Sequence, residues 1–101
     1  MERRVKLGVL LKGILGNSRV YYQAPPNQTL EYPCIKYERS KFESEFAGNR
    51  PYRIKTRYSI LVMYRDPDFS VPKKIAELPQ CEHDRKYVVD GLYHDVFSIY
   101  Y

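Results

Sequence analysis

The sequence of 101 residues contains no tryptophan, only two cysteines and two histidines, and no apolar run longer than residues 60–64. The two cysteines, Cys34 and Cys81, are too few for the disulfide framework of a small secreted domain. The apolar run is far too short to cross a bilayer as a helix. The N-terminal segment also lacks a small-residue cleavage site after its apolar stretch. We therefore expect a cytosolic protein with reduced thiols and no membrane association.

The length and composition fit a single globular domain spanning residues 1–101. A core of this size is marginal on its own, so stabilisation by partner subunits is expected. Eleven of the residues are tyrosines, a residue that favours strands and is enriched at protein interfaces.

The net charge of +5 is unevenly distributed along the chain. Residues 1–20 and 36–57 together carry twelve Lys/Arg and four Glu, whereas residues 65–101 carry five Lys/Arg and seven Asp/Glu. Nucleic acid could contact the basic part, or like subunits could stack a basic face on an acidic one. A protein that grips phosphates is more often basic throughout, so the pattern favours self-association.

The first half of the chain predicts one helix and two strands. Leucines and isoleucine at helical spacing indicate an amphipathic helix that ends at Gly16. Strands are expected at residues 19–23 and 32–39. Residues 40–51 carry charges, a glycine and a proline, and fit either a long loop or the tip of an extended hairpin.

The second half predicts a central strand, a short helix and a hairpin. Residues 52–65 alternate between an apolar face and a face that is basic at its start. Residues 71–78 form a short helix after the N-cap Ser70, and Asp90-Gly91 is a two-residue hairpin turn. The expected fold is α+β: a mainly antiparallel sheet with an N-terminal helix and a second short helix packed on it, in the order α-β-β-β-α-β-β.

Residues 81–97 hold a cysteine, both histidines and several acidic residues, so they resemble a metal or catalytic site. The Asp-Gly turn pairs Tyr87 with His94 and Lys86 with Asp95, and it places Cys81 opposite Tyr100. His83 is then about 13 Å from the position facing His94, too far for one shared ion. No phosphate-binding glycine loop or oriented nucleophile is evident. We therefore predict no catalytic residue, no metal site and no cofactor.

The stretch "YPCIKYER" and the later "YRDPDFSVPKKIAELPQCEHDRKYVVDGLYHDVFSIYY" carry a family resemblance. Their Tyr-Pro-Cys-Ile strand, Arg-Asp-Pro-Asp turn, Leu-Pro-x-Cys segment and His-Asp-Val-Phe ending resemble small structural proteins of tailed-phage morphogenesis modules. The element order is similar to that of tail terminator (tail completion) proteins, and the likeness covers most of the chain from about Leu10. At 101 residues the chain is shorter than many terminators, which leaves a head-closure or other neck role open.

The resemblance implies a structural protein of the virion, assembled in the host cytoplasm as a homohexameric ring. Such a ring caps the tail tube protein and joins it to the head connector or head completion protein, and weak DNA contact in its channel is conceivable. A small basic nucleic-acid-binding module is the alternative reading. Eight residues are expected at interfaces: Phe42, Phe46, Arg53, Lys55, Arg57, Tyr93, Tyr100 and Tyr101.

Overall fold

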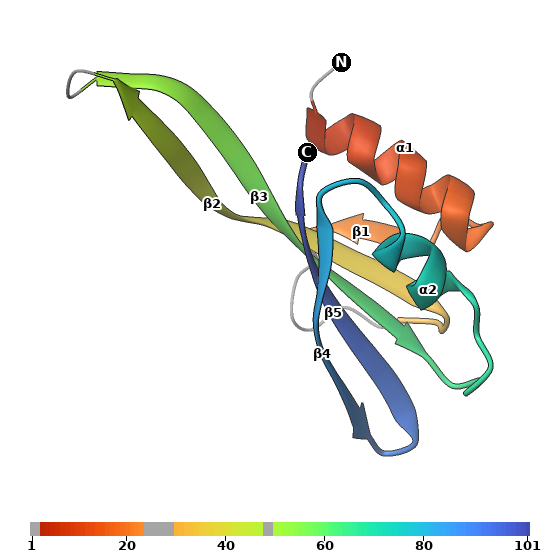
Figure 1. Ribbon diagram of the computed structural model, residues 1–101. Coiled ribbons are helices and arrows are strands. Elements are labelled where there is room, and N and C mark those ends of the chain that lie inside the picture. Colours follow the sequence, from red (N-terminus) through yellow and green to blue (C-terminus); the bar gives the residue numbers. More distant parts are fainter. Residues whose placement is uncertain (1–2, 24–29, 48–49) are drawn as a thin grey trace.

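The computed structural model describes residues 3–23, 30–47 and 50–101, and the side chains of residues 43–54 lie outside this description. These described residues form two helices and five strands, in the predicted order α-β-β-β-α-β-β (Figure 1). Their bounds are α1 Arg3–Leu15, β1 Val20–Tyr22, β2 Cys34–Ala47, β3 Arg50–Tyr64, α2 Val71–Ala76, β4 Cys81–Val89 and β5 Leu92–Tyr100.

The five strands form one sheet in the order β1-β2-β3-β5-β4. Only the short β1 runs parallel to its neighbour, because β2–β3, β3–β5 and β4–β5 are all antiparallel pairs. The predicted α+β class, with a mainly antiparallel sheet, is therefore confirmed. The strand predicted to be central, β3, is indeed the middle strand.

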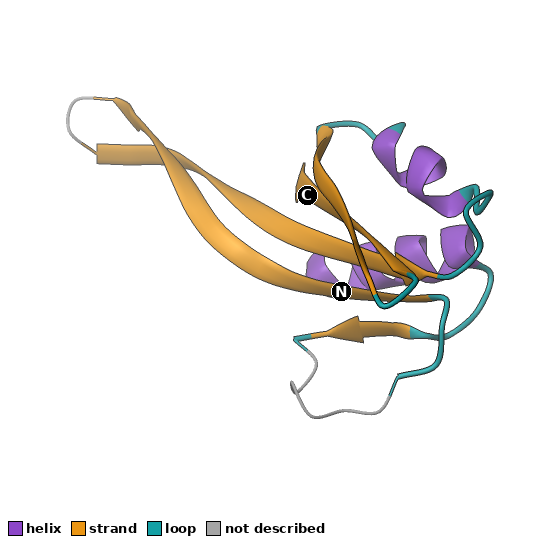
Figure 2. Cartoon of the chain, turned by 90° about the horizontal axis from the view of Figure 1, so that it is seen from below, coloured by secondary structure: helices purple, strands orange, loops and turns teal. Residues whose placement is uncertain are grey.

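Both helices pack on the same face of the sheet (Figure 2). Leu7 and Leu11 of α1 and Ile75 of α2 are fully buried there, together with Ile60 of β3 and Phe97 of β5. The leucines follow the i, i+4 spacing that gives a helix one apolar face. Among the described residues no helix covers the opposite face of the sheet, where Cys34 and Met63 are nevertheless buried.

The helix boundaries follow local chemistry. Gly16 has φ +82, a left-handed conformation that glycine adopts without strain, directly after the last residue of α1. Ser70 is the N-cap of α2 as predicted, although its side chain makes no capping hydrogen bond. The helix ends at Ala76, two residues earlier than predicted.

Strands β2 and β3 form a long two-stranded arm that projects from the body (Figure 1). Their pairing runs from Cys34–Met63 to Ala47–Arg50, whereas β5 accompanies β3 only as far as Arg57. The molecule is accordingly elongated, with extents of 51 × 25 × 24 Å. The long-loop alternative for residues 40–51 is wrong, and the extended-hairpin alternative is confirmed for the described residues.

The β4–β5 hairpin turns at Asp90-Gly91, whose φ angles are +51 and +74. The register matches prediction at Lys86–Asp95, Tyr87–His94, Val88–Tyr93 and Val89–Leu92. A register shift between His83 and Arg85 then places Cys81 opposite Ile99. The predicted Cys81–Tyr100 pairing is therefore wrong by one residue, because a bulge adds one residue to β4.

Candidate functional site

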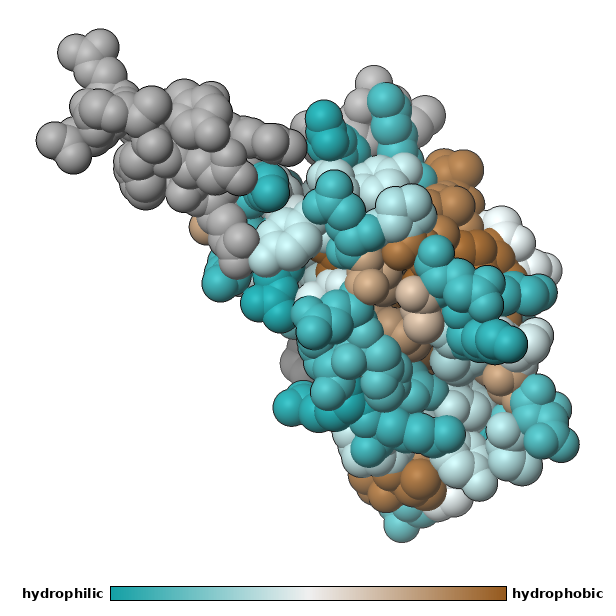
Figure 3. All heavy atoms as spheres, viewed as in Figure 1, coloured by the Kyte–Doolittle hydropathy of each residue, from teal (hydrophilic) through white to brown (hydrophobic). Residues whose placement is uncertain are grey.

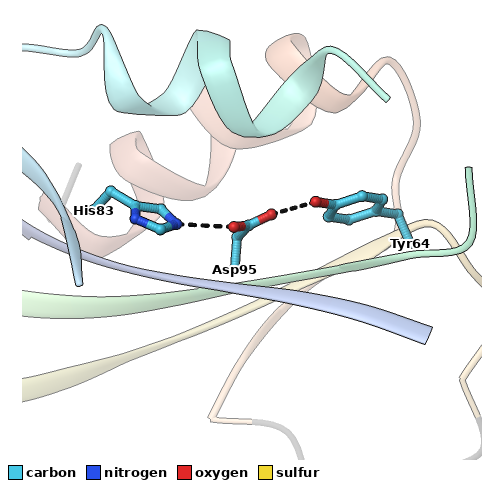
Figure 4. Close-up of polar contacts among 3 residues, drawn as sticks. All are labelled: Tyr64, His83 and Asp95. Carbon is cyan, nitrogen blue, oxygen red and sulfur yellow. Dashed lines mark hydrogen bonds and ion pairs between the residues drawn. The ribbon is translucent and has the colours of Figure 1, made fainter. Parts of the chain in front are cut away.

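A polar network crosses the helix-covered face between three strands (Figure 4). Asp95 of β5 is only 3% exposed. Its carboxylate accepts a hydrogen bond of 2.5 Å from the hydroxyl of Tyr64 on β3, and it lies 2.8 Å from Nε2 of His83 on β4. Burial of a carboxylate is costly unless its oxygens are paired, and both oxygens here have a partner.

Aromatic rings surround this network. The ring of Tyr64 stacks on that of Tyr93 and contacts that of Phe69, with 5.3 Å between ring centroids in both pairs. The rings of His83 and Phe97 meet in a T-shaped arrangement, with 5.0 Å between their centroids. Burial, followed by the hydrogen bond to Asp95, raises the pKa of Tyr64 well above its usual value. Tyr64 therefore stays a hydrogen-bond donor to Asp95 throughout the physiological pH range.

The network fastens the edge strand to the sheet. Within the described sheet β4 pairs only with β5, and most of its residues are exposed. Through Asp95, the His83 side chain ties this edge to β5 and onward to Tyr64 of the central strand. Sequence reasoning missed the network: the register that places Lys86 opposite Asp95 is correct, but the carboxylate of Asp95 was expected to pair with the Lys86 ammonium group. The Lys86 ammonium group lies over the Tyr93 ring, 5.3 Å from its centroid.

The two histidines lie on opposite faces of the sheet. His83 contacts Asp95 and Phe97 on the helix-covered face, whereas His94 stacks on Tyr87 at 4.6 Å on the other face. They cannot bind one ion together. Among the described residues, no three His, Cys, Asp or Glu side chains come together in a way that could hold a metal.

Neither cysteine is set up as a nucleophile. Cys34 is fully buried and Cys81 is half-buried, and both are free thiols. Desolvation by burial raises the pKa of each thiol from 9.0 to about 11. Activated thiols have the opposite shift, because a nearby cation or helix N-terminus lowers their pKa.

We predict that thiol labelling of the native protein distinguishes the two cysteines. At pH 8, Cys34 should react only through molecules that have unfolded, whereas Cys81 should react slowly with the folded protein. Because its pKa is raised, the Cys81 rate should keep increasing with pH up to about pH 11. Mass spectrometry after timed iodoacetamide quenches measures both rates. Rapid labelling of Cys81 at neutral pH would contradict this prediction.

The base of the arm carries three of the predicted interface residues. Arg57 donates a 2.7 Å hydrogen bond to Ser98, which in turn donates to Asp84, so this arginine is fixed against β5 and β4. The ammonium group of Lys55 is 6.0 Å from the centroid of the Tyr100 ring. Neither side chain points freely into solvent as a phosphate-binding residue would.

The other five predicted interface residues differ in their surroundings. Phe42 is 60% exposed on the arm, beneath the guanidinium of Arg39. Tyr93 and Tyr101 are half-buried and pack against the core cluster. The side chains of Phe46 and Arg53 lie outside the described residues.

Large apolar side chains are exposed at two further places. Val88 and Val89, at the end of the β4–β5 hairpin, are 54% and 51% exposed. Val5 and Val9 are exposed on the outer side of α1. Figure 3 shows one apolar patch near the hairpin end and another over the region of α1. Exposed apolar groups that gather in this way often mark contacts with other proteins.

A groove lies where α1 begins and β5 ends. It encloses about 260 Å³ and is lined by side chains from α1, the segment after α2, and the end of the chain. These are Arg3, Leu10, Leu78, Pro79, Gln80, Ile99, Tyr100 and Tyr101. Arg3 is the only charged residue among the described residues that line it, and apart from Gln80 the others are apolar or aromatic.

Comparisons with protein-family models, curated protein sequences and solved structures found no significant match to this chain. None of the helices described is long and apolar enough to span a membrane.

Proposed function

We propose that this chain is a ring-forming structural protein of a tailed-phage virion. Its role in this proposal is that of a tail terminator, which caps the tail tube protein and joins it to the head connector. The proposal combines the resemblance in sequence with the surfaces of the molecule. Its work consists of protein–protein contact, and six copies form the ring.

The arm is the observation that carries this proposal. Beyond Arg57, β2 and β3 pair only with each other within the described sheet. An isolated two-stranded ribbon is marginally stable in water. A chain of this size therefore gains little stability from extending such an arm, unless the arm lies against a neighbouring subunit or an adjoining ring.

The location of charge and apolar surface supports self-assembly. Residues 39–57 carry six Lys/Arg and two Glu, whereas residues 66–84 carry five Asp/Glu and two Lys. Potentials of opposite sign steer association and select orientation. The exposed apolar groups at Phe42, Val88 and Val89 lie on separate parts of the molecule, as a head-to-tail interface requires.

Disruption of the gene for this chain should distinguish the terminator role from a head-closure or other neck-connector role. A terminator stops tube growth, so a phage with this gene disrupted should produce tubes of uncontrolled length and tailless heads. A head-closure protein or another neck connector would leave tails of normal length that fail to attach. Negative-stain electron microscopy of the lysate measures tube lengths. Tails of normal length would contradict the terminator role.

The basic arm also favours a second candidate, a nucleic-acid-binding module. We expect this activity to be weak, because Arg57 is bonded to Ser98 and Lys55 packs over Tyr100. Titration of duplex DNA at several salt concentrations measures it. Under the structural proposal, the log of affinity should fall with log salt with a slope of magnitude no more than about 2, since few phosphates are contacted. A slope above about 5 would favour the nucleic-acid-binding role.

A further inference from the structure

We infer that copies of this chain join head to tail, with the β4–β5 hairpin end of one copy seated in the groove of the next. We call Val88, Val89 and Asp90 the hairpin tip, and the receiving surface is the groove lined by Arg3, Leu78 and Tyr101. This inference rests on the proposed ring and identifies the surfaces that would close it.

The tip and the groove lie at opposite ends of one strand. β5 begins at Leu92, beside the turn, and Ile99 and Tyr100 at its other end line the groove. Eight steps of about 3.3 Å from Leu92 to Tyr100 separate the two surfaces by roughly 26 Å. Figure 1 shows the β4–β5 turn and the C-terminus at opposite ends of the body. Two different surfaces on opposite ends form a heterologous contact, which repeats from copy to copy and closes into a ring when the rotation between neighbours is a whole fraction of a turn, as the proposed ring requires.

The chemistry of the two surfaces is complementary. The tip presents two exposed valines followed by an exposed aspartate. The described groove lining presents mainly apolar and aromatic side chains together with one cation, Arg3. Val88 and Val89 point to opposite faces of the hairpin, so the tip presents an apolar group to each wall of the groove. Insertion of the tip removes this apolar area from water, which is the main favourable term in association. The pairing of Asp90 with Arg3 would fix the orientation.

The tip is suited to insertion because its backbone is held in one shape. Asp90 and Gly91 both adopt positive φ, as in the tight two-residue turns that connect antiparallel strands. His83 and Asp95 fasten β4 to the sheet behind the tip. A rigid projection loses less conformational entropy on binding than a flexible loop does.

Two variants test the tip and the groove independently. Val89→Asp places a charge on the tip, and Arg3→Glu combined with Tyr101→Asp repels the tip from the groove. Arg3 and Val89 are exposed in the single chain, so substitutions there should change Tm little in thermal melts. If Tyr101→Asp lowers Tm, Arg3→Glu alone serves as the groove variant. Val9→Asp, on the outer side of α1, is the matched control for a charge placed on an exposed valine.

Analytical ultracentrifugation and native mass spectrometry then measure association up to millimolar protein. We expect the wild type and Val9→Asp to form oligomers, and each of the other two variants to weaken association at least about 10-fold. An equimolar mixture of the tip and groove variants should form a 1:1 dimer and nothing larger, because only one intact junction remains in each pair.

Three results would overturn the inference. The first is a wild type that stays monomeric at millimolar concentration. The second is an oligomer that survives Val89→Asp, and the third is loss of association in Val9→Asp, which would place the contact on α1. If wild-type rings persist in the tip variant, the proposed function stands and only the identity of this interface is wrong.

Discussion

Replacement of Asp95 by alanine should lower the free energy of unfolding by about 3 kcal/mol. The carboxylate accepts the Tyr64 hydroxyl and contacts His83, and it is 3% exposed. Its removal leaves the buried Tyr64 hydroxyl without its partner, whereas His83, whose side chain is 41% exposed, can bond to water instead. Removal of one member of a buried polar pair typically costs several kcal/mol. Urea unfolding followed by circular dichroism measures the loss.

Coupling between the three residues distinguishes this network from simple packing. Tyr64→Phe and His83→Phe should each cost about 1 kcal/mol in the wild type. In the Asp95→Ala background each of these substitutions should cost less stability, because the hydrogen bond from that side chain to Asp95 is already absent. Glu38→Ala, on an exposed part of β2, is the control and should change stability by less than about 0.5 kcal/mol. Additive costs at Tyr64 and Asp95 would contradict the proposed coupling.

Replacement of Gly8 by alanine should destabilise the protein by about 2 kcal/mol, although alanine is the better helix former. A Cβ at this position would lie 2.5 Å from the hydroxyl oxygen of Tyr37. That hydroxyl donates a 2.8 Å hydrogen bond to the carbonyl oxygen of Arg4, and the ring is buried. The ring must therefore shift and stretch or break this bond. Thermal and urea unfolding measure the change.

Gly13 provides the matched control on the same helix. A Cβ there meets nothing within 4 Å, so Gly13→Ala should stabilise the protein by up to about 1 kcal/mol. Tyr37→Phe removes the crowding oxygen, so the Gly8→Ala penalty should shrink in that background. Equal effects at Gly8 and Gly13 would show that the contact with Tyr37 does not constrain α1.

Local chemistry explains which parts of the fold were predictable. The Asp90-Gly91 turn depends on a dipeptide that tolerates positive φ. Its position in the sequence was therefore enough to predict the pairing of β4 with β5 next to the turn. The alternation in β3 places Ile60 and Val62 in the core, as expected. The charged stretch after Ser40 resembled a loop, yet its pairing with β3 determines its structure.

Tertiary contacts explain what the sequence could not provide. The bulge in β4 lets Asp84 reach Ser98 on one face while His83 reaches Asp95 on the other, and neither partner is adjacent in sequence. The polar network did leave one signal. Asp95 shares its strand face with Phe97 and Ile99 by the two-residue period, so a carboxylate at that position had to be buried and paired.

Cryo-electron microscopy of the virion neck tests the proposed role most directly. We expect a closed ring of this chain between the tail tube and the head connector, in which each arm lies against a neighbouring subunit or ring. The hydrophobic core between the helices and the sheet should be the same in every copy, with Asp95 still buried between Tyr64 and His83. A neck that lacks this chain, or one that holds it as single unconnected copies, would contradict the proposal.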